Sequence, residues 1–142
     1  MYCEAWVEEG KIIDGVQRVQ QSPLLDFFKL GEALSFCLAD LRSYRTDDTF
    51  LPDADFNRLT DWARSLTCPG VLVIPQPLII EKNNTERNLL SFKTQYQQLL
   101  QALGESGHDI VLLSGDVHFG RIAIAQLGPA GGRLVEVIAS PL

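Results

Sequence analysis

The order of hydrophobic and polar residues along the chain predicts a series of strands and helices. Ile110 to Leu113 is a run of four apolar residues between turn-forming residues, which is typical of a strand buried on both faces. Val71 to Ile74 has the same pattern and is stopped by Pro75-Gln76-Pro77. We therefore expect both segments to be strands in the centre of a sheet.

Two longer segments follow the helical period. Asp53 to Leu66 and Asn88 to Leu103 each carry apolar residues at spacings of three and four, so each predicts a helix with one buried face. We expect Asp53 or Asp55 to cap the first helix and Pro69-Gly70 to end it. Together the two helices have enough apolar surface to cover one face of a sheet.

The remaining segments predict two hairpins and one irregular stretch. Leu24 to Leu30 and Ala33 to Leu41 are typical of two strands joined by the glycine-led turn Gly31-Glu32, and Arg121 to Leu127 and Arg133 to Ala139 flank a second glycine-rich turn. Met1 to Gln21 alternates only weakly and predicts a short helix or a loose arm.

The predicted element order is therefore β-β-α-β-α-β-β-β, without an internal repeat. It indicates a mixed α/β fold, in which sheet layers are flanked by helices, over a single domain spanning residues 1–142. The central β-α-β-α-β portion should form a parallel ladder with right-handed crossovers. The abrupt start and the apolar end suggest a portion of a larger domain, and an uncovered sheet face would favour a homo-oligomer.

Composition narrows the class of protein. The 46% apolar and 21% charged residues are typical of an ordinary globular chain. A net charge of −6 opposes nucleic-acid binding, and the apolar runs are far shorter than the ~18 residues of a membrane span. The three cysteines are an odd number without close spacing, so we expect reduced, mostly buried thiols and a cytoplasmic setting.

The chemistry with the clearest spacing follows the run Ile110 to Leu113. Gly115 allows a tight turn or a close approach of the backbone to a ligand, and Asp116 and His118 come directly after it. If this segment stays extended, the two side chains project to the same side. A carboxylate beside an imidazole suits Zn, Mn or Fe. The alternative is that the Asp caps a turn and the His is a surface residue.

A second candidate group follows the apolar run Phe36 to Ala39. Arg42 and Arg45 are placed to hold phosphate oxygens, with Asp40 beside them. The alternative is a surface arginine pair with a local carboxylate partner. Arg121 is a weaker candidate, because a hairpin arginine more commonly faces solvent.

Two of these segments resemble a known family. Leu113-Ser-Gly-Asp-Val-His-Phe119 resembles the last metal-binding motif of PhoD-like metallophosphatases, a branch of the calcineurin-like phosphoesterases, and Leu38-Ala-Asp-Leu-Arg-Ser-Tyr-Arg45 is similar to that family's Asp-x-Arg-Ser-Tyr-Arg signature. Trp62 to Leu66 with Val71 to Leu78 looks like the helix and strand that come next, and Tyr2 to Trp6 resembles an upstream aromatic stretch. The resemblance runs over most of the 142 residues and is specific at the first two motifs.

The resemblance implies a metal-dependent phosphomonoesterase or phosphodiesterase, as in PhoD-like alkaline phosphatases, with a four-layer α/β/β/α sandwich. Asp116 and His118 would be the catalytic metal ligands, and Arg42 or Arg45 would bind the phosphate-ester substrate. The complete family domain holds two metal ions, drawn from Fe, Ca, Mn and Zn, and its relatives are often exported.

In the family, the other metal ligands belong to strands that come earlier in the domain. The given sequence does not contain those strands, so we expect an incomplete site. His108 cannot replace them, because the strand between the two histidines separates it from His118 by about 20 Å. The alternative function is a truncated, non-catalytic derivative that acts as a protein-interaction or oligomerising module.

Overall fold

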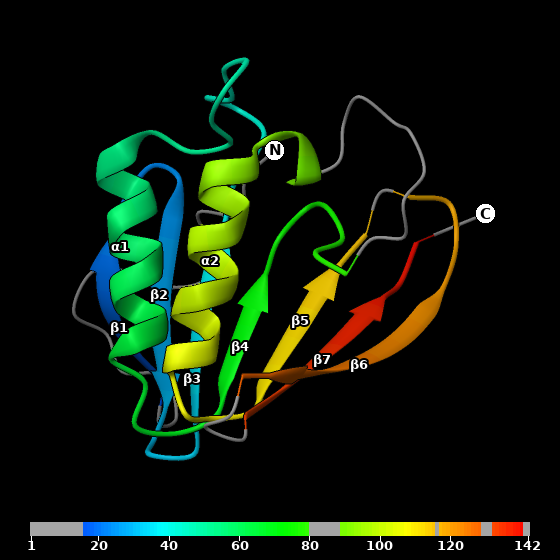
Figure 1. Ribbon diagram of the computed structural model, residues 1–142. Helices are drawn as coiled ribbons and strands as arrows, with labels where there is room; N and C mark the ends of the chain where they lie inside the picture. The colour runs from blue at the N-terminus through cyan, green and yellow to red at the C-terminus, as the bar shows by residue number, and fades with distance from the viewer. Residues whose placement is uncertain (1–15, 80–88, 116, 129–131, 141–142) are drawn as a thin grey trace.

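The computed structural model describes residues 16–79, 89–115, 117–128 and 132–140, with the backbone alone for residues 16–21. These residues form a seven-stranded sheet in the order β1-β2-β3-β4-β5-β7-β6, and Figure 1 shows helices α1 and α2 on the same face of it. The predicted mixed α/β class, a sheet flanked by helices, is confirmed.

The element bounds follow the predicted segments closely. The strands are β1 (Val16–Gln21), β2 (Leu25–Leu30), β3 (Leu34–Ala39), β4 (Gly70–Val73), β5 (Ile110–Ser114), β6 (Arg121–Leu127) and β7 (Gly132–Ile138). The helices are α1 (Asp53–Arg64) and α2 (Lys93–Glu105), and a short 3-10 turn, η1 (Leu89–Ser91), precedes α2. The expectation of a helix or loose arm before Pro23 is wrong for Val16–Gln21, which pairs with β2 as a strand; residues 1–15 lie outside the described residues.

The pairing places four strand ends at one edge of the sheet. Strands β3, β4 and β5 are parallel, as predicted, and β7 also runs parallel to β5. β6 and β7 form the predicted antiparallel hairpin, with β7 inserted between β5 and β6. The carboxyl ends of β3, β4, β5 and β7 (Ala39, Val73, Ser114 and Ile138) therefore share one side of the molecule, which we call the carboxyl edge.

Helix α1 packs closely on the sheet. A Cβ on Gly70 would lie 3.3 Å from Trp62 Cη2, so the glycine permits this approach, and Trp62 Nε1 donates to Ser35 Oγ at 3.0 Å. The expected aspartate cap is not formed: the residue before the helix is Pro52, without a side-chain cap bond. Asp55 instead accepts from Ser22 Oγ at 2.7 Å, which ties α1 to the segment before β2.

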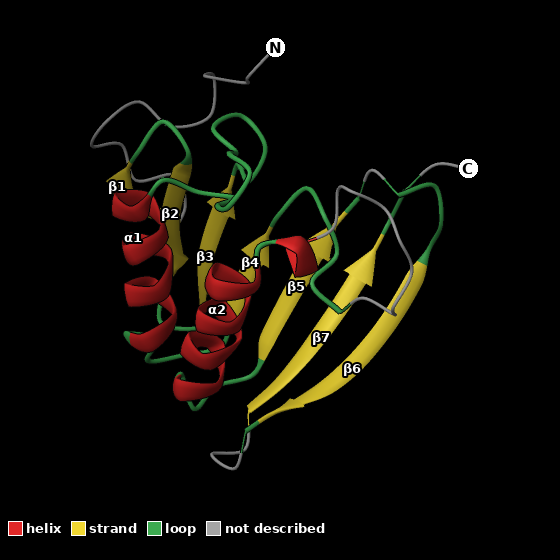
Figure 2. Cartoon of the chain, turned by 45° about the horizontal axis from the view of Figure 1, so that its top comes forward, coloured by secondary structure: helices red, strands yellow, loops and turns green. Residues whose placement is uncertain are grey.

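The opposite face of the sheet carries no helix in the part of the chain that the structure describes (Figures 1 and 2). Side chains there lie in register across six strands, and we call this surface the open face. Its members are Asp26, Phe28, Phe36, Leu38, Val71, Val73, Val111, Leu113, Ile122, Ile124, Val135 and Val137. These members are apolar apart from Asp26, and the polar Gln126 and Arg133 continue the same side of β6 and β7.

The open face corrects the expectation that β5 is buried on both faces. Ile110 and Leu112 are fully buried on the helix side, whereas Leu113 on the open face is 38% exposed. An apolar run alone does not distinguish a strand covered twice from a strand covered once, because the side chains alternate between the two faces.

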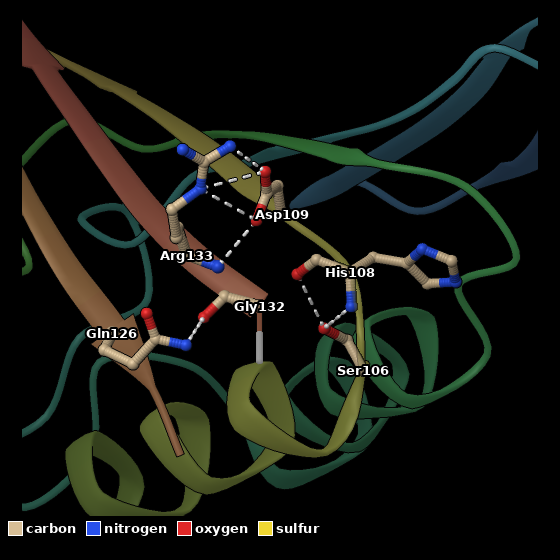
Figure 3. Close-up of polar contacts among 6 residues, drawn as sticks. All are labelled: Ser106, His108, Asp109, Gln126, Gly132 and Arg133. Carbon is tan, nitrogen blue, oxygen red and sulfur yellow. Dashed lines mark hydrogen bonds and ion pairs between the residues drawn. The ribbon is translucent and has the colours of Figure 1, made fainter. Parts of the chain in front are cut away.

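A cluster of hydrogen bonds and an ion pair, drawn in Figure 3, joins the residue before β5 to β7. Asp109 accepts from the Arg133 backbone N–H at 2.8 Å and from its guanidinium Nη2 at 2.6 Å. A Cβ on Gly132 would collide with the carbonyl group of His108, so the glycine permits the two backbones to meet. The His108 imidazole points away from the Asp109–Arg133 pair (Figure 3).

The structure also bears on the expectations for the cysteines and for a membrane span. Cys37 and Cys68 are free and buried, as predicted, and burial raises the pKa of the Cys37 thiol; Cys3 lies outside the described residues. None of the described helices is long and apolar enough to cross a membrane.

Candidate functional site

The carboxyl end of β5 lies very close to the carboxyl end of β7. Ala139 N–H donates to the Ser114 carbonyl at 3.1 Å, and a Cβ on Gly115 would lie only 3.3 Å from the Ala139 carbonyl oxygen. Gly115 is thus a position of close approach between two backbones, whereas the predicted approach to a ligand stays a prediction. Val117 and His118 lie beyond this point, at the carboxyl edge.

His118 is exposed at this edge and has an unusual backbone conformation. Its φ is +57°, in the left-handed region, where histidine is found more often than most residues but still at some cost. The segment is therefore not extended at His118, and the inference that Asp116 and His118 share a side because the chain is extended is wrong. Asp116 lies outside the described residues, so its closeness to His118 stays a prediction.

Ser140 fixes the turn that carries His118, and no pattern in the sequence indicates this role. The Ser140 hydroxyl oxygen accepts from the backbone N–H groups of Val117 at 3.2 Å and His118 at 3.0 Å. The contact joins residues 22 positions apart, across the β6–β7 hairpin, so no local spacing reports it. One half-buried serine thus sets the path of the chain directly before His118.

The first candidate arginine sits in a turn organised by Asp40. Asp40 Oδ1 accepts from the backbone N–H groups of Arg42 at 2.9 Å and Ser43 at 3.1 Å, and the Ser43 hydroxyl donates to the same carboxylate. This turn begins directly after β3, so Arg42 is at the carboxyl edge, as predicted, and its side chain is exposed.

The second candidate arginine is partly buried and has structural partners. Arg45 Nη2 donates to Gln76 Oε1, and the guanidinium lies over the Phe92 ring, 4.9 Å from its centroid. Burial lowers the pKa of Arg45, and the positive charge of Arg42 lowers it further. Arg45 Nε is buried and has no hydrogen-bond partner among the described residues. The fold thus brings the predicted Arg42 and Arg45 near each other and adds Gln76 from the end of β4.

Like Ser140, Glu136 accepts several hydrogen bonds near the carboxyl edge and was not among the predicted site residues. It is fully buried on the helix side of β7 and accepts from the backbone N–H groups of Leu78 at 2.6 Å and Ile79 at 3.0 Å. Arg121 Nη2 donates to its other oxygen at 2.5 Å. The sequence does contain a signal, because Glu136 falls on the inward phase of an alternating strand, between Leu134 and Ile138.

This arrangement also corrects the interpretation of Arg121 as a hairpin arginine facing solvent. Arg121 pairs with the buried Glu136 and donates to the Ile79 carbonyl. The pair holds the segment after β4 against the β6–β7 hairpin, and the Tyr96 hydroxyl donates to the Leu78 carbonyl of that segment at 2.9 Å.

The described residues do not form a metal centre alone. Among residues 16–79, 89–115, 117–128 and 132–140, no group of three His, Cys, Asp or Glu side chains is placed to hold a metal ion. A catalytic zinc site uses at least three protein ligands. His118 nevertheless supplies an exposed imidazole at the carboxyl edge, where further ligands from outside these residues could join it.

No protein-family model matches the chain, and no curated protein is significantly similar to it. The resemblance to PhoD-like metallophosphatases therefore stays a prediction from the two motifs in the sequence.

Proposed function

We propose that this chain is part of a metal-dependent phosphoric ester hydrolase and that Asp116 and His118 contribute to its metal-ligand set. The observation that carries the proposal is the position of His118: an exposed imidazole directly beyond the carboxyl end of β5, in a left-handed conformation fixed by Ser140. In open α/β sheets, ligands bind outside the carboxyl ends of the strands.

The neighbouring residues support a phosphate ester as the substrate class. Arg42 and Arg45 follow β3 at the same edge, and guanidinium groups bind phosphate oxygens well. The Arg45 Nε and the Ser114 hydroxyl are buried there without a partner among the described residues, which leaves polar atoms available to a ligand. Metal ions in such hydrolases polarise the phosphoryl oxygen. The described residues hold no complete ligand set, so a working site needs ligands from outside them.

The proposal is tested by metal binding to the purified chain. We expect Mn²⁺ binding, measured by isothermal titration calorimetry, to be lost in Asp116→Asn and in His118→Ala. His108→Ala is the matched control, because His108 precedes β5 and lies at the opposite end of the strand from the carboxyl edge. Equal Mn²⁺ binding by the unaltered chain and His118→Ala would refute the proposed role.

Hydrolysis is measured alongside binding, with p-nitrophenyl phosphate and its bis ester. We expect rates close to those of buffer for this chain, because no group of three ligands exists among the described residues. Strong turnover that disappears in His118→Ala would mean that the site is complete, with ligands from outside those residues.

A second candidate function is a non-catalytic interaction module. It is favoured by the open face, where Leu38 and Leu113 are each 38% exposed among members that are apolar apart from Asp26. Apolar patches of this kind mark interaction surfaces in soluble proteins. Absence of Mn²⁺ binding, together with concentration-dependent association, would favour this function over the hydrolase.

A further inference from the structure

Strand β6 (Arg121–Leu127) is the last strand of the sheet on its side, next to β7 alone. Figures 1 and 2 show it along the border of the sheet, with no described strand or helix beyond it. A strand in this position presents backbone groups that can pair with another strand. The direction of those groups follows from the hydrogen bonds of its neighbours.

Along a strand, successive residues direct their backbone groups to opposite sides. Each residue therefore turns both its N–H and its C=O toward one neighbouring strand. Ala139 N–H donates to the Ser114 carbonyl of β5, so alternate β7 residues face β5, and Glu136 and Ile138 face β6. Their register partners Ala123 and Arg121 therefore direct their backbone groups to β7. The backbone groups of the intervening β6 residues point outward from the sheet, namely those of Ile122, Ile124 and Gln126.

The side chains of strand β6 favour pairing as well. Ile122 is 72% exposed and Ile124 is 68% exposed, the highest values among the large apolar residues that the structure describes. Residues 122–127 contain no charged residue and no proline. Charges and prolines are the means by which natural edge strands prevent pairing; the charge in β6 is Arg121, which pairs with the buried Glu136, and residues 122–127 lack both.

We propose that β6 pairs antiparallel with β6 of a second copy of this chain, on a two-fold axis at Ala123. Outward-facing residues must meet outward-facing residues, and an axis at any residue of β6 satisfies this rule. The axes at Ala123 and at Ile124 are the two that set both isoleucines of each copy opposite outward-facing residues of β6. An axis at Ala123 sets Ile122 of each copy opposite Ile124 of the other, in two apolar cross-strand pairs. An axis at Ile124 sets Ile122 opposite the polar Gln126, so the first register is favoured.

This interface is short and opposed by charge. The strand has seven residues, and at ~3.4 Å each they give an edge of about 24 Å, so the contact falls in the class of small, transient interfaces. Each copy carries a net charge of −6, and the repulsion between copies is screened by salt. The dimer should therefore form at micromolar or higher concentrations and gain strength as salt is added. The inference does not depend on the metal chemistry proposed above.

The register is tested by disulfide trapping. In the proposed dimer the two Ala123 residues form a non-hydrogen-bonded pair with Cα atoms about 4.5 Å apart, which is within reach of a disulfide. We expect Ala123→Cys to give a covalent dimer under mild oxidation. Ala125→Cys is the matched control on the same side of β6, and its two copies are too far apart to bridge. The unaltered chain reports any cross-linking through its own cysteines.

Association itself is measured by sedimentation over a range of concentrations and salt. Ile124→Lys places a charge on the edge and should weaken association about tenfold or more. Leu113→Lys, which changes the open face and leaves the edge intact, should have little effect. A monomer at all concentrations, or a dimer sensitive to Leu113→Lys and not to Ile124→Lys, overturns the proposal. A disulfide that forms only in a mixture of Ala123→Cys and Ala125→Cys overturns the register.

Discussion

Replacement of Glu136 by glutamine should destabilise the fold by about 2–3 kcal/mol. The carboxylate is fully buried and accepts two backbone N–H groups and Arg121. Hydrogen bonds to a charged acceptor contribute about 1.5–3 kcal/mol, against about 0.5–1.5 for neutral ones. The introduced amide retains one acceptor for the loop N–H groups but turns a donor toward the guanidinium. Arg121 is 27% exposed, so water compensates it in part, and the loss stays below that of a fully buried pair.

The free energy of unfolding is measured by urea titration and the Tm by calorimetry, where a loss of this size corresponds to roughly 6–12 °C for a chain of this length. The double variant Glu136→Gln with Arg121→Gln completes a cycle that isolates the coupling between the pair. A change below about 0.5 kcal/mol in the single variant would show that the carboxylate does not hold the segment after β4.

Tyr96 provides an independent measurement of the same charge. Burial raises the pKa of the Tyr96 hydroxyl above its ordinary 10.0, and the negative charge of Glu136 raises it further. Glu136→Gln should lower that pKa without restoring the ordinary value, since the burial remains. Because the folded-state pKa is raised, the contribution of Tyr96 to stability is complete below about pH 10 and is lost as pH rises through the folded-state pKa. Ultraviolet titration, with Tyr96→Phe as reference, follows both changes.

Two further substitutions test the two ends of β5. Gly132→Ala should cost about 2 kcal/mol or more in urea unfolding, because its Cβ would lie 3.0 Å from the His108 carbonyl carbon and the backbone would have to shift; a neutral effect would show that the two backbones are not in contact. Ser140→Ala should speed amide hydrogen exchange at Val117 and His118, with Ser140→Thr restoring protection, and unchanged exchange would contradict the hydrogen bonds of the Ser140 hydroxyl.

The elements that could be predicted are those set by local pattern. The strand around Ile110 to Leu113, the helix from Asp53 and the β6–β7 hairpin each follow from the spacing of apolar and turn-forming residues within one segment. What failed depends on partners far along the chain. The aspartate cap was wrong because the helix begins at Asp53, directly after Pro52, so both aspartates lie inside its first turn, and Asp55 accepts instead from Ser22, 33 positions earlier. Strand β5 is covered on one face only, because both described α-helices lie on the same face of the sheet.

The candidate site shows the same division. The positions of Arg42 and His118 beyond strand ends follow from the sequence, because a strand end can be recognised from the residues that stop it. The environment of each side chain cannot be predicted from the sequence, because Gln76 meets Arg45 and Ser140 meets His118 only through the strand order of the sheet. Glu136 does have a local signal, a carboxylate in the inward phase of an apolar strand.

The strand order β5-β7-β6 has a consequence for how the chain folds during synthesis. Strand β5 ends at Ser114, but its neighbour β7 is complete only at Ile138, after β6 has been made. At roughly 5–20 residues per second, the ribosome needs about 1–5 s to add this stretch. During that interval one side of β5 has no strand to pair with, and the exposed apolar residues are available to chaperones or to other nascent chains. The arrival of β7 then completes the parallel ladder and closes the gap between β5 and β6.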